Sequence, residues 1–427
     1  MRKKAAITAL LIFALALAPS PARAQGGENL TLSIALLGPG TELFFWWGHI
    51  SLLVEDSLTG RATFFDYGIF SFETENFFTN FAMGRLIFST GSFDANMYVH
   101  SYIMSNRDVI FFNLDLPPQT RLEIYEFVQN SVLPENRYYY YHHFFDNCST
   151  RLRDIIDIAT GGQFREQFGE APSRFTLRQH VRRHTWFSPF FDWLLNFLMG
   201  QRIDTPITVW DDMFLPSELA RRIQEFYYTD SEGNRRQLVS GTEVIFLASD
   251  RPEVLEDAPV QWPRKLVFSL CVSALVLLFS FLQARKKRIG RVLLGATYSA
   301  AGFVFGSAGL LLYFMAIFTD HDYTFDNINM LFGTPLLLAA IPLGIRYARS
   351  KDLSAKKFLK TSFYLRALWL LCALGVIASM LIKLLPQFWQ DNLPDQMLML
   401  PLALAFALHP AGLKKLLAGR KKYLKRK

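Results

Sequence analysis

The pattern of hydrophobic and polar positions changes once along the chain, near Lys265. Between Gln25 and Arg264, short stretches with strand-like alternation or helix-like spacing follow one another, with charged residues among them. Beyond Lys265 the apolar runs are long, and five are predicted to cross a membrane as helices: residues 266–282, 292–318, 331–345, 363–385 and 397–408. We therefore expect an α+β domain, residues 25–264, followed by an α-helical membrane domain of about five spans, residues 265–427.

The first 24 residues have the three parts of a secretory signal peptide. A basic segment, residues 1–4, precedes an apolar run that ends at Ala18, and the small-residue sequence Ala22-Arg-Ala24 follows. Cleavage there would start the mature chain near Gln25. An uncleaved anchor is the alternative, which the shortness of the apolar run disfavours. In both cases the residues that follow are expected to be exported.

The distribution of charge gives an independent prediction of topology, because lysine and arginine favour the cytoplasmic side of a membrane. The segments between the predicted spans alternate: 285–291 is basic, 320–326 acidic, 346–360 basic, 391–395 acidic, and the tail 420–427 basic. This order predicts a cytoplasmic C-terminus and a first domain on the opposite side. After Arg264 there are 22 basic and 6 acidic residues, which is a net charge of +16. Because the whole chain carries +8, residues 1–264 carry −8, and this negative charge disfavours nucleic-acid binding by the first domain.

Cys148 is the only cysteine among residues 25–264, so it cannot form a disulfide within that domain. It stands where a helix is predicted to begin, because Leu152, Ile155, Ile156 and Ala159 follow it at helical spacing. The first turn of a helix has unpaired amides and a positive dipole end, and both favour a thiolate. Cys148 is therefore the predicted nucleophile, with an ordinary buried thiol as the alternative.

His49 is the predicted general base of this site, with a core histidine as the alternative. It opens a strand-like run about a hundred residues before Cys148, and this order is the reverse of that in papain. A circularly permuted papain-like fold would bring the two residues together. Side chains expected to orient the imidazole or to stabilise an oxyanion, beside the Cys148 backbone N–H, are Asn147, Asp146, Asp66, Tyr67 and His142. Ligands at zinc-site spacing are not found, so neither a metal nor a cofactor is expected.

Several motifs taken together resemble the periplasmic domain of Lnb-type proteins. They extend over almost all of residues 30–220 and are Trp47-Gly-His49, Phe65-Asp-Tyr-Gly68, Gly84-Arg-Leu86, Asn106-Arg107, Phe145-Asp-Asn-Cys-Ser-Thr-Arg151, Arg174-Phe-Thr-Leu177, Gly200 with Asp204, and Phe214-Leu-Pro216. Lnb-type proteins are similar in fold to NlpC-type thiol peptidases and lecithin-retinol acyltransferases, and a membrane domain follows their periplasmic domain. The resemblance implies a place in the bacterial inner membrane and N-acylation of bacterial lipoproteins.

The implied reaction moves a fatty acyl chain from a phospholipid, through a Cys148 thioester, to the N-terminal amine of a lipidated protein or peptide. Phospholipid, lipidated acceptor and membrane are thus the expected partners. In the segment expected outside, His321, Asp326 and Asn327 are candidates for holding a lipid headgroup or the acceptor amine, with a solvated loop as the alternative.

Two other functions compete with acyl transfer. A thiol peptidase or amidase acting on cell-wall peptides would use the same pair of residues, since that chemistry also cleaves amides. A catalytically silent binding module is the third possibility. Five spans favour lipid chemistry, because a hydrolase of wall peptides needs only one tether.

Overall fold

The computed structural model describes residues 26–71, 76–285 and 287–409. Their contacts separate two compact units: the first holds residues up to Phe70, Phe88–Gly169 and Met213–Ser249, and the second holds Ser71–Ile87, Glu170–Asp212 and the chain from Asp250 onward. The predicted signal peptide, residues 1–24, and the basic tail, residues 420–427, lie outside the described residues.

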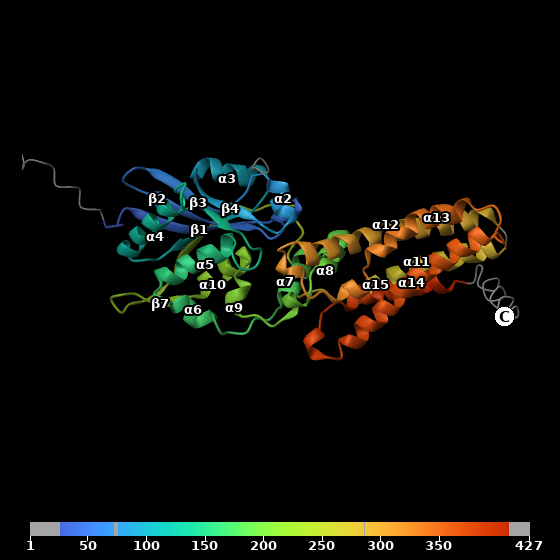
Figure 1. The fold of residues 1–427 in the computed structure, drawn as a ribbon. Coiled ribbons are helices and arrows are strands. Elements are labelled where there is room, and N and C mark those ends of the chain that lie inside the picture. The colour runs from blue at the N-terminus through green and yellow to red at the C-terminus, as the bar shows by residue number, and fades with distance from the viewer. Residues whose placement is uncertain (1–25, 72–75, 286, 410–427) are drawn as a thin grey trace, which may run out of the picture. The chain divides into compact units, whose positions relative to one another are not determined.

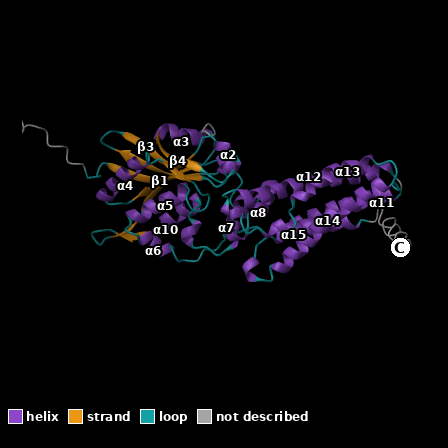
Figure 2. Ribbon diagram, in the orientation of Figure 1, coloured by secondary structure: helices purple, strands orange, loops and turns teal. Residues whose placement is uncertain are grey.

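A sheet, whose strands are orange in Figure 2, forms the centre of the first unit. It has seven strands in the order β6-β4-β3-β2-β1-β5-β9. The pairings β1–β2, β1–β5, β2–β3, β3–β4 and β5–β9 are antiparallel. The strands are β1 (Leu30–Leu37), β2 (His49–Asp56), β3 (Arg61–Ile69), β4 (Ile87–Asp94), β5 (Val109–Leu114), β6 (Tyr138–Tyr140) and β9 (Val239–Phe246). A separate antiparallel pair joins β7 (Tyr227–Thr229) to β8 (Arg235–Gln237).

Helices cover both faces of this sheet (Figure 1). They are α3 (Ala95–Met104), α4 (Pro118–Ser131), α5 (Cys148–Ala159), α6 (Gln163–Phe168) and α10 (Pro216–Glu225), with the 3-10 helix η1 (Leu43–Phe45) before β2. Tyr98 of α3 packs with Leu37, Leu53 and Phe64 on one face, while α4, α5 and α10 pack on β1 and β2 from the other. The predicted combination of helices and strands in this part is confirmed, and β1, an interior strand of the sheet, is almost wholly buried.

The second unit is helical. Its α-helices are α2 (Phe77–Ala82), α7 (Leu177–Thr185), α8 (Pro189–Leu198), α9 (Val209–Asp212), α11 (Trp262–Ala284), α12 (Arg288–Phe318), α13 (Ala340–Arg349), α14 (Lys356–Ile382) and α15 (Leu393–Leu408). The 3-10 helices are η2 (Gln201–Asp204), η3 (Asp322–Thr324), η4 (Ile328–Leu331), η5 (Pro335–Ala339) and η6 (Pro386–Phe388). Residues 71–87 and 170–212, which precede the long apolar helices in the sequence, thus cluster with those helices.

Three described helices are long and apolar enough to cross a membrane: α11, α12 and α14. The count of five spans is not confirmed. The third predicted run is divided into η4, η5 and the ten-residue α13, with Pro335 at the start of η5. Proline has no N–H to donate, so it begins a helical segment more readily than it continues one. The fifth run is the apolar helix α15, which is shorter than a usual span.

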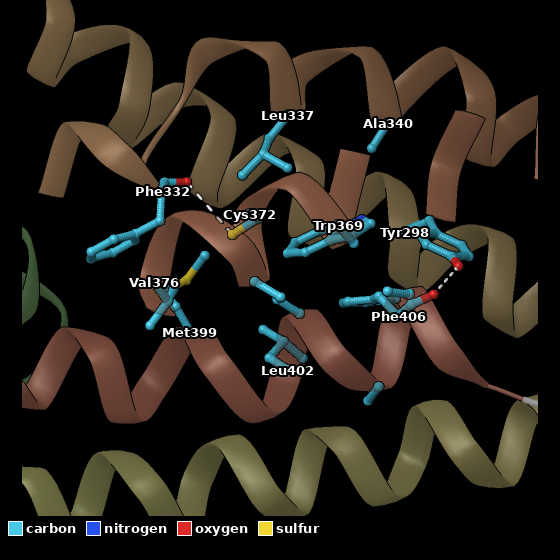
Figure 3. Packing of buried hydrophobic residues seen from close by; sticks show 14 of the residues in the cluster. Tyr298, Phe332, Leu337, Ala340, Trp369, Cys372, Val376, Met399, Leu402 and Phe406 are labelled. Carbon is cyan, nitrogen blue, oxygen red and sulfur yellow. Dashed lines mark hydrogen bonds between the residues drawn. The ribbon is translucent and has the colours of Figure 1, made fainter. Parts of the chain in front are cut away.

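Close side-chain packing joins these helices around Trp369 of α14 (Figure 3). Its ring stacks on Phe406 of α15 at 4.5 Å between centroids, and the Tyr298 hydroxyl of α12 donates to the Phe406 carbonyl at 2.6 Å. Ser269 Oγ donates to Leu398 O, and Ser280 Oγ lies 2.9 Å from His409 Nδ1. Both contacts join residues 129 positions apart, so α11 and α15 run parallel.

A buried ion pair fixes the start of α7 to the segment after α8. Arg178 is fully buried, and its Nε and Nη2 atoms donate to the Asp204 carboxylate at 2.6 and 3.0 Å. The same guanidinium donates to the carbonyls of Asn196, Met199 and Gly200. Paired charges with complete hydrogen bonding are the form in which ions are tolerated in a protein interior.

Candidate active site

Helix α5 begins at Cys148, as the spacing of its apolar residues predicts. Asn147 is the N-cap, and its side-chain oxygen accepts from Ser149 N and Thr150 N at 2.9 and 3.0 Å, while the Thr150 hydroxyl accepts from Asn147 N at 2.8 Å. Cys148 itself is buried, with 8% of its surface exposed. Its backbone N–H meets no acceptor among the described residues, so an amide donor remains beside the sulfur.

His49 is the first residue of β2 and pairs with a carboxylate on β3. Its Nε2 atom lies 2.6 Å from Asp66 Oδ1. An Nε2–H donated to Asp66 leaves Nδ1 as the basic nitrogen of the neutral ring. Nδ1 makes no hydrogen bond to any residue in the described part of the chain. The imidazole is thus held by one nitrogen and has the other available for a proton.

Asp66 is in turn held by helix α3. The Tyr98 hydroxyl donates to Asp66 Oδ2 at 2.7 Å, and the Tyr102 hydroxyl lies 3.3 Å from that of Tyr98. Asp66 and Tyr98 are 6% and 8% exposed, so these hydrogen bonds are shielded from water. The carboxylate therefore has little freedom to rotate away from His49.

Neighbouring charges make the imidazolium form of His49 unusually stable. Burial by itself would lower the pKa of His49, but the charge of Asp66, electrostatic interactions with Tyr102 and Cys148, and the hydrogen bond to Asp66 outweigh burial, so the pKa is raised well above 6.5. The effect of Cys148 also means that its sulfur lies within electrostatic range of the ring. A thiolate and an imidazolium would stabilise each other in this arrangement.

Gly68 of β3 lies beside the start of α5. Its φ angle is 88°, and a Cβ atom placed there would lie 3.8 Å from Cys148 Cβ and 3.6 Å from Tyr141 Cε2. The start of α5 therefore lies against β3 two residues beyond Asp66. Cys148, His49 and Asp66 come from three elements and meet at one end of the sheet.

Tyr139 of β6 was not singled out in the sequence and belongs to this site. Its hydroxyl is buried and has no hydrogen-bond partner among the described residues, while the Arg151 guanidinium lies 4.4 Å from its ring centroid. Burial and, next, the negative charge of Cys148 raise the pKa of Tyr139 above its usual value of 10. The hydroxyl is thus a neutral donor near the sulfur. Its only sequence signal was its place in the run Tyr138–Tyr141, nine residues before the cysteine.

Three other predicted site residues form hydrogen bonds with protein groups around them. Tyr67 OH lies 3.2 Å from Ser131 Oγ, and His142 Nδ1 accepts from the amides of Phe144 and Phe145. Asp146 binds Arg151 through both carboxylate oxygens, at 2.5 and 2.7 Å.

The Asn147 amide group is fully engaged as well. In addition to capping α5, its Nδ2 donates to the carbonyls of His143 and Phe214 at 2.8 and 3.0 Å. Both amide protons are thus already donated, and Asn147 shapes the turn that presents Cys148.

The three residues predicted to contact substrate from the outer loop lie in the second unit, and each contacts protein there. His321 Nε2 donates to Phe81 O at 3.1 Å, and Asp326 pairs with Arg202 at 2.9 Å. Asn327 Nδ2 donates to the carbonyls of Phe197 and Leu198, both at 3.0 Å. These contacts order the loop.

A metal centre is not part of this arrangement: within residues 26–71, 76–285 and 287–409, no group of three or more His, Cys, Asp or Glu side chains could hold an ion. The arrangement brings together a sulfur at a helix start, an imidazole, a carboxylate that holds the imidazole, and two hydrogen-bond donors without an acceptor among the described residues. Groups of these kinds can support nucleophilic chemistry by a thiol.

The chain combines a sheet unit that holds this site with helices long and apolar enough to cross a membrane. This combination is typical of membrane proteins that carry a folded domain outside the bilayer. A family model described as the Lnb N-terminal periplasmic domain matches residues 22–183, and a second described as the Lnb transmembrane domain matches residues 259–409. No curated protein and no solved structure matches the chain.

The two family models match in the order that the resemblance required and together cover most of the sequence. The chain belongs to the Lnb family, and it is a membrane protein with a periplasmic N-terminal domain. The predicted relationship is confirmed, and membership indicates an enzyme of the Lnb type.

Proposed function

We propose that this protein is a membrane-bound cysteine acyltransferase. It moves a fatty acyl chain from a phospholipid to the N-terminal amine of a lipidated protein or peptide, with a thioester on Cys148 as the intermediate. The observation that carries the proposal is the hydrogen bond of 2.6 Å between His49 Nε2 and Asp66. This bond leaves Nδ1 as the basic atom of the imidazole, and the imidazole lies within electrostatic range of Cys148.

In the first half-reaction the Cys148 thiolate attacks the carbonyl carbon of a phospholipid acyl ester. The C–S bond forms as the carbonyl becomes an oxyanion, and the C–O bond to the glycerol oxygen then breaks. The His49 imidazolium gives its proton to that oxygen, so a lysophospholipid leaves as a neutral alcohol. The acyl chain remains on Cys148 as a thioester.

In the second half-reaction the free amine of the acceptor attacks the thioester. His49, now neutral, takes a proton from the attacking nitrogen, and the C–S bond breaks to release Cys148 as the thiolate. The products are an amide and the original thiolate–imidazolium pair. Asp66 stabilises the imidazolium in both half-reactions because its negative charge lies 2.6 Å from Nε2.

Two donors are available for the oxyanion. The Cys148 N–H and the Tyr139 hydroxyl have no acceptor among the described residues, and each would form a hydrogen bond as the negative charge develops. A donor that is already in place and unpaired costs no reorganisation when the charge appears.

We also propose how the chain is organised. It has a cleaved signal peptide at residues 1–24, a permuted papain-like domain at 25–264, five spans within 265–427 and a cytoplasmic C-terminus. Membership of a family with a transmembrane domain supports lipid substrates, since both proposed substrates reside in a bilayer.

Intact-mass spectrometry of the purified protein in phospholipid micelles tests the proposal. The wild-type chain should gain the mass of one acyl chain, and hydroxylamine should remove it because thioesters are labile to this nucleophile. Cys148→Ala should gain nothing. Cys271→Ala, which removes an exposed cysteine of α11, is the matched control and should be acylated normally.

A diacylated lipopeptide added to the acyl-enzyme should receive the chain on its free amine. The absence of an adduct with unconsumed phospholipid would contradict the proposal. Cleavage of a cell-wall peptide without any adduct would instead establish the thiol peptidase or amidase.

A further inference from the structure

Helix α2 presents an exposed aromatic face. It has six residues, Phe77–Ala82, and three of them are phenylalanine. Phe78 is 69% exposed and Phe81 is 48% exposed, and these two residues lie three positions apart on the same side of the helix. Exposed aromatic side chains gathered on one side of an element mark an interaction surface.

The segment that contains α2 is fastened to the loop after α12. Asp320 N donates to Met83 O at 2.8 Å, and His321 Nε2 donates to Phe81 O at 3.1 Å. Arg85 Nε adds an ion pair with Asp320 Oδ2 at 2.9 Å. Two of these bonds join backbone carbonyls of the α2 segment, so they fix its main chain and not merely a side chain.

Gly84 permits this close approach. Its φ angle is 77°, and a Cβ atom there would lie 2.7 Å from His321 N and 2.8 Å from Asp320 C. Every residue other than glycine would therefore collide with the loop, in a backbone conformation that it already disfavours. The fold is built so that the α2 segment and the loop touch.

The loop in turn begins at the end of a membrane helix. α12 ends at Phe318, and Asp320 and His321 follow directly. The last turns of α12 expose apolar side chains: Ile317 is 56% exposed and Phe318 is 65% exposed. If α12 crosses a bilayer, as its length and composition allow, we expect these side chains where hydrocarbon meets the headgroups.

From these contacts we infer that α2 is a membrane-interface anchor, whose Phe78 and Phe81 insert among the lipids of the leaflet on the periplasmic side. The occupant of this surface is lipid because α2 is bound within three residues of the last residue of α12. Phenylalanine is also among the apolar residues that helices lying in the membrane interface bury at the boundary of headgroups and acyl chains. The inference concerns membrane contact and does not depend on the proposed acyl transfer.

Photo-crosslinking of the full chain in phosphatidylcholine vesicles tests this contact. A benzophenone amino acid is introduced at Phe78 and, in a second variant, at Thr79. Thr79 is also exposed but is turned by about 100° around the helix. A third variant carries the probe at Leu278 of α11, an exposed position in a predicted span, as the positive control.

The probe at 78 should form lipid adducts with a yield close to that at 278 and several-fold above that at 79, as measured by intact mass. A yield at 78 no greater than at 79, while 278 reacts with lipid, would overturn the inference. Because the probe reports contact and not catalysis, this result stands whether or not Cys148 becomes acylated.

Discussion

Replacing Asp66 with asparagine should lower the pKa of His49 by about one unit. The substitution keeps the size of the side chain, and the new amide can accept from His49 Nε2 with its oxygen and donate to the Tyr98 hydroxyl with its nitrogen, but it removes the negative charge 2.6 Å from His49 Nε2. The pKa of His49 is raised mainly by that charge acting against burial. Asp66→Asn therefore isolates one cause of the shift with little change in packing.

The magnitude follows from the strength of the bond that is lost. A hydrogen bond to a charged partner contributes about 1.5–3 kcal/mol, whereas a neutral one contributes about 1 kcal/mol. The difference of roughly 1–2 kcal/mol applies to the imidazolium only, and 1.36 kcal/mol corresponds to about one pKa unit. Because the folded-state pKa exceeds 6.5, the charged pair stabilises the fold fully below about pH 6.5. That stability disappears as the pH rises through the folded pKa, and Asp66→Asn should reduce it.

The assay is the pH dependence of Cys148 alkylation by iodoacetate, followed by mass spectrometry of the peptide that contains Cys148. Iodoacetate is an anion, so its rate should fall as the imidazolium loses its proton, and the upper apparent pKa of the pair reports that loss. The upper pKa should be about one unit lower in Asp66→Asn. Asp146→Asn removes a carboxylate that binds Arg151 instead, and should leave the upper pKa unchanged.

An upper pKa that is the same in wild type and Asp66→Asn would refute the argument. The charge of Asp66 would then not act on His49 in solution, and the imidazole would have a different partner. A shift of equal size in Asp146→Asn would refute it too, because the effect would be a general change of charge near Cys148.

Two further predictions concern single hydrogen-bonding groups. Tyr139→Phe should slow formation of the acyl-enzyme by about 10²–10³-fold, the range for loss of one oxyanion donor, as measured by rapid-quench mass spectrometry. Tyr140→Phe alters an exposed neighbour and should leave this rate unchanged. Equal rates in the two variants would show that Tyr139 does not act as an oxyanion donor. Arg178→Met should cost about 3–5 kcal/mol of unfolding free energy because Asp204 is left buried and unpaired. Arg202→Met breaks an exposed pair and should cost below about 1 kcal/mol, so similar denaturation midpoints would contradict this reasoning.

Features set by neighbouring residues could be predicted from the sequence. The start of α5 at Cys148 follows from the Asn147 cap and from apolar residues at helical spacing, and both signals lie within twelve residues. The strand that His49 opens was visible as the mostly apolar run Ile50–Val54, which only Ser51 interrupts. Long apolar runs also indicated the helical second part, because length and composition alone decide that prediction.

Features that depend on how distant strands align could not be predicted. Asp66 faces His49 while its neighbour Tyr67 faces Ser131, because successive side chains of a strand point to opposite faces. Which face meets His49 depends on the register of β2 and β3, and the sequence does not state it. Tyr98 holds Asp66 from α3, 32 residues further along the chain, and carried no local signal. Tyr139 lies close to Cys148 in the sequence, but its place in the run Tyr138–Tyr141 did not distinguish it from its neighbours.

The division of the third apolar run was missed for a different reason. Hydropathy counts apolar residues without regard to backbone hydrogen bonding, and Pro335 is apolar enough to remain in the run. Its missing N–H and fixed φ angle place it at the start of η5, so one predicted span became three short helical segments.

The place of β9 in the sheet limits how the periplasmic part can be shortened for expression. β9 forms one margin of the sheet by pairing with β5, yet it comes from residues 239–246, well after the end of the first family match at residue 183. A fragment truncated there would leave β5 with bare backbone N–H and C=O groups, a surface that recruits strands from other copies and leads to aggregation. A soluble version of the sheet should therefore extend through Phe246, sixteen residues before α11 begins at Trp262.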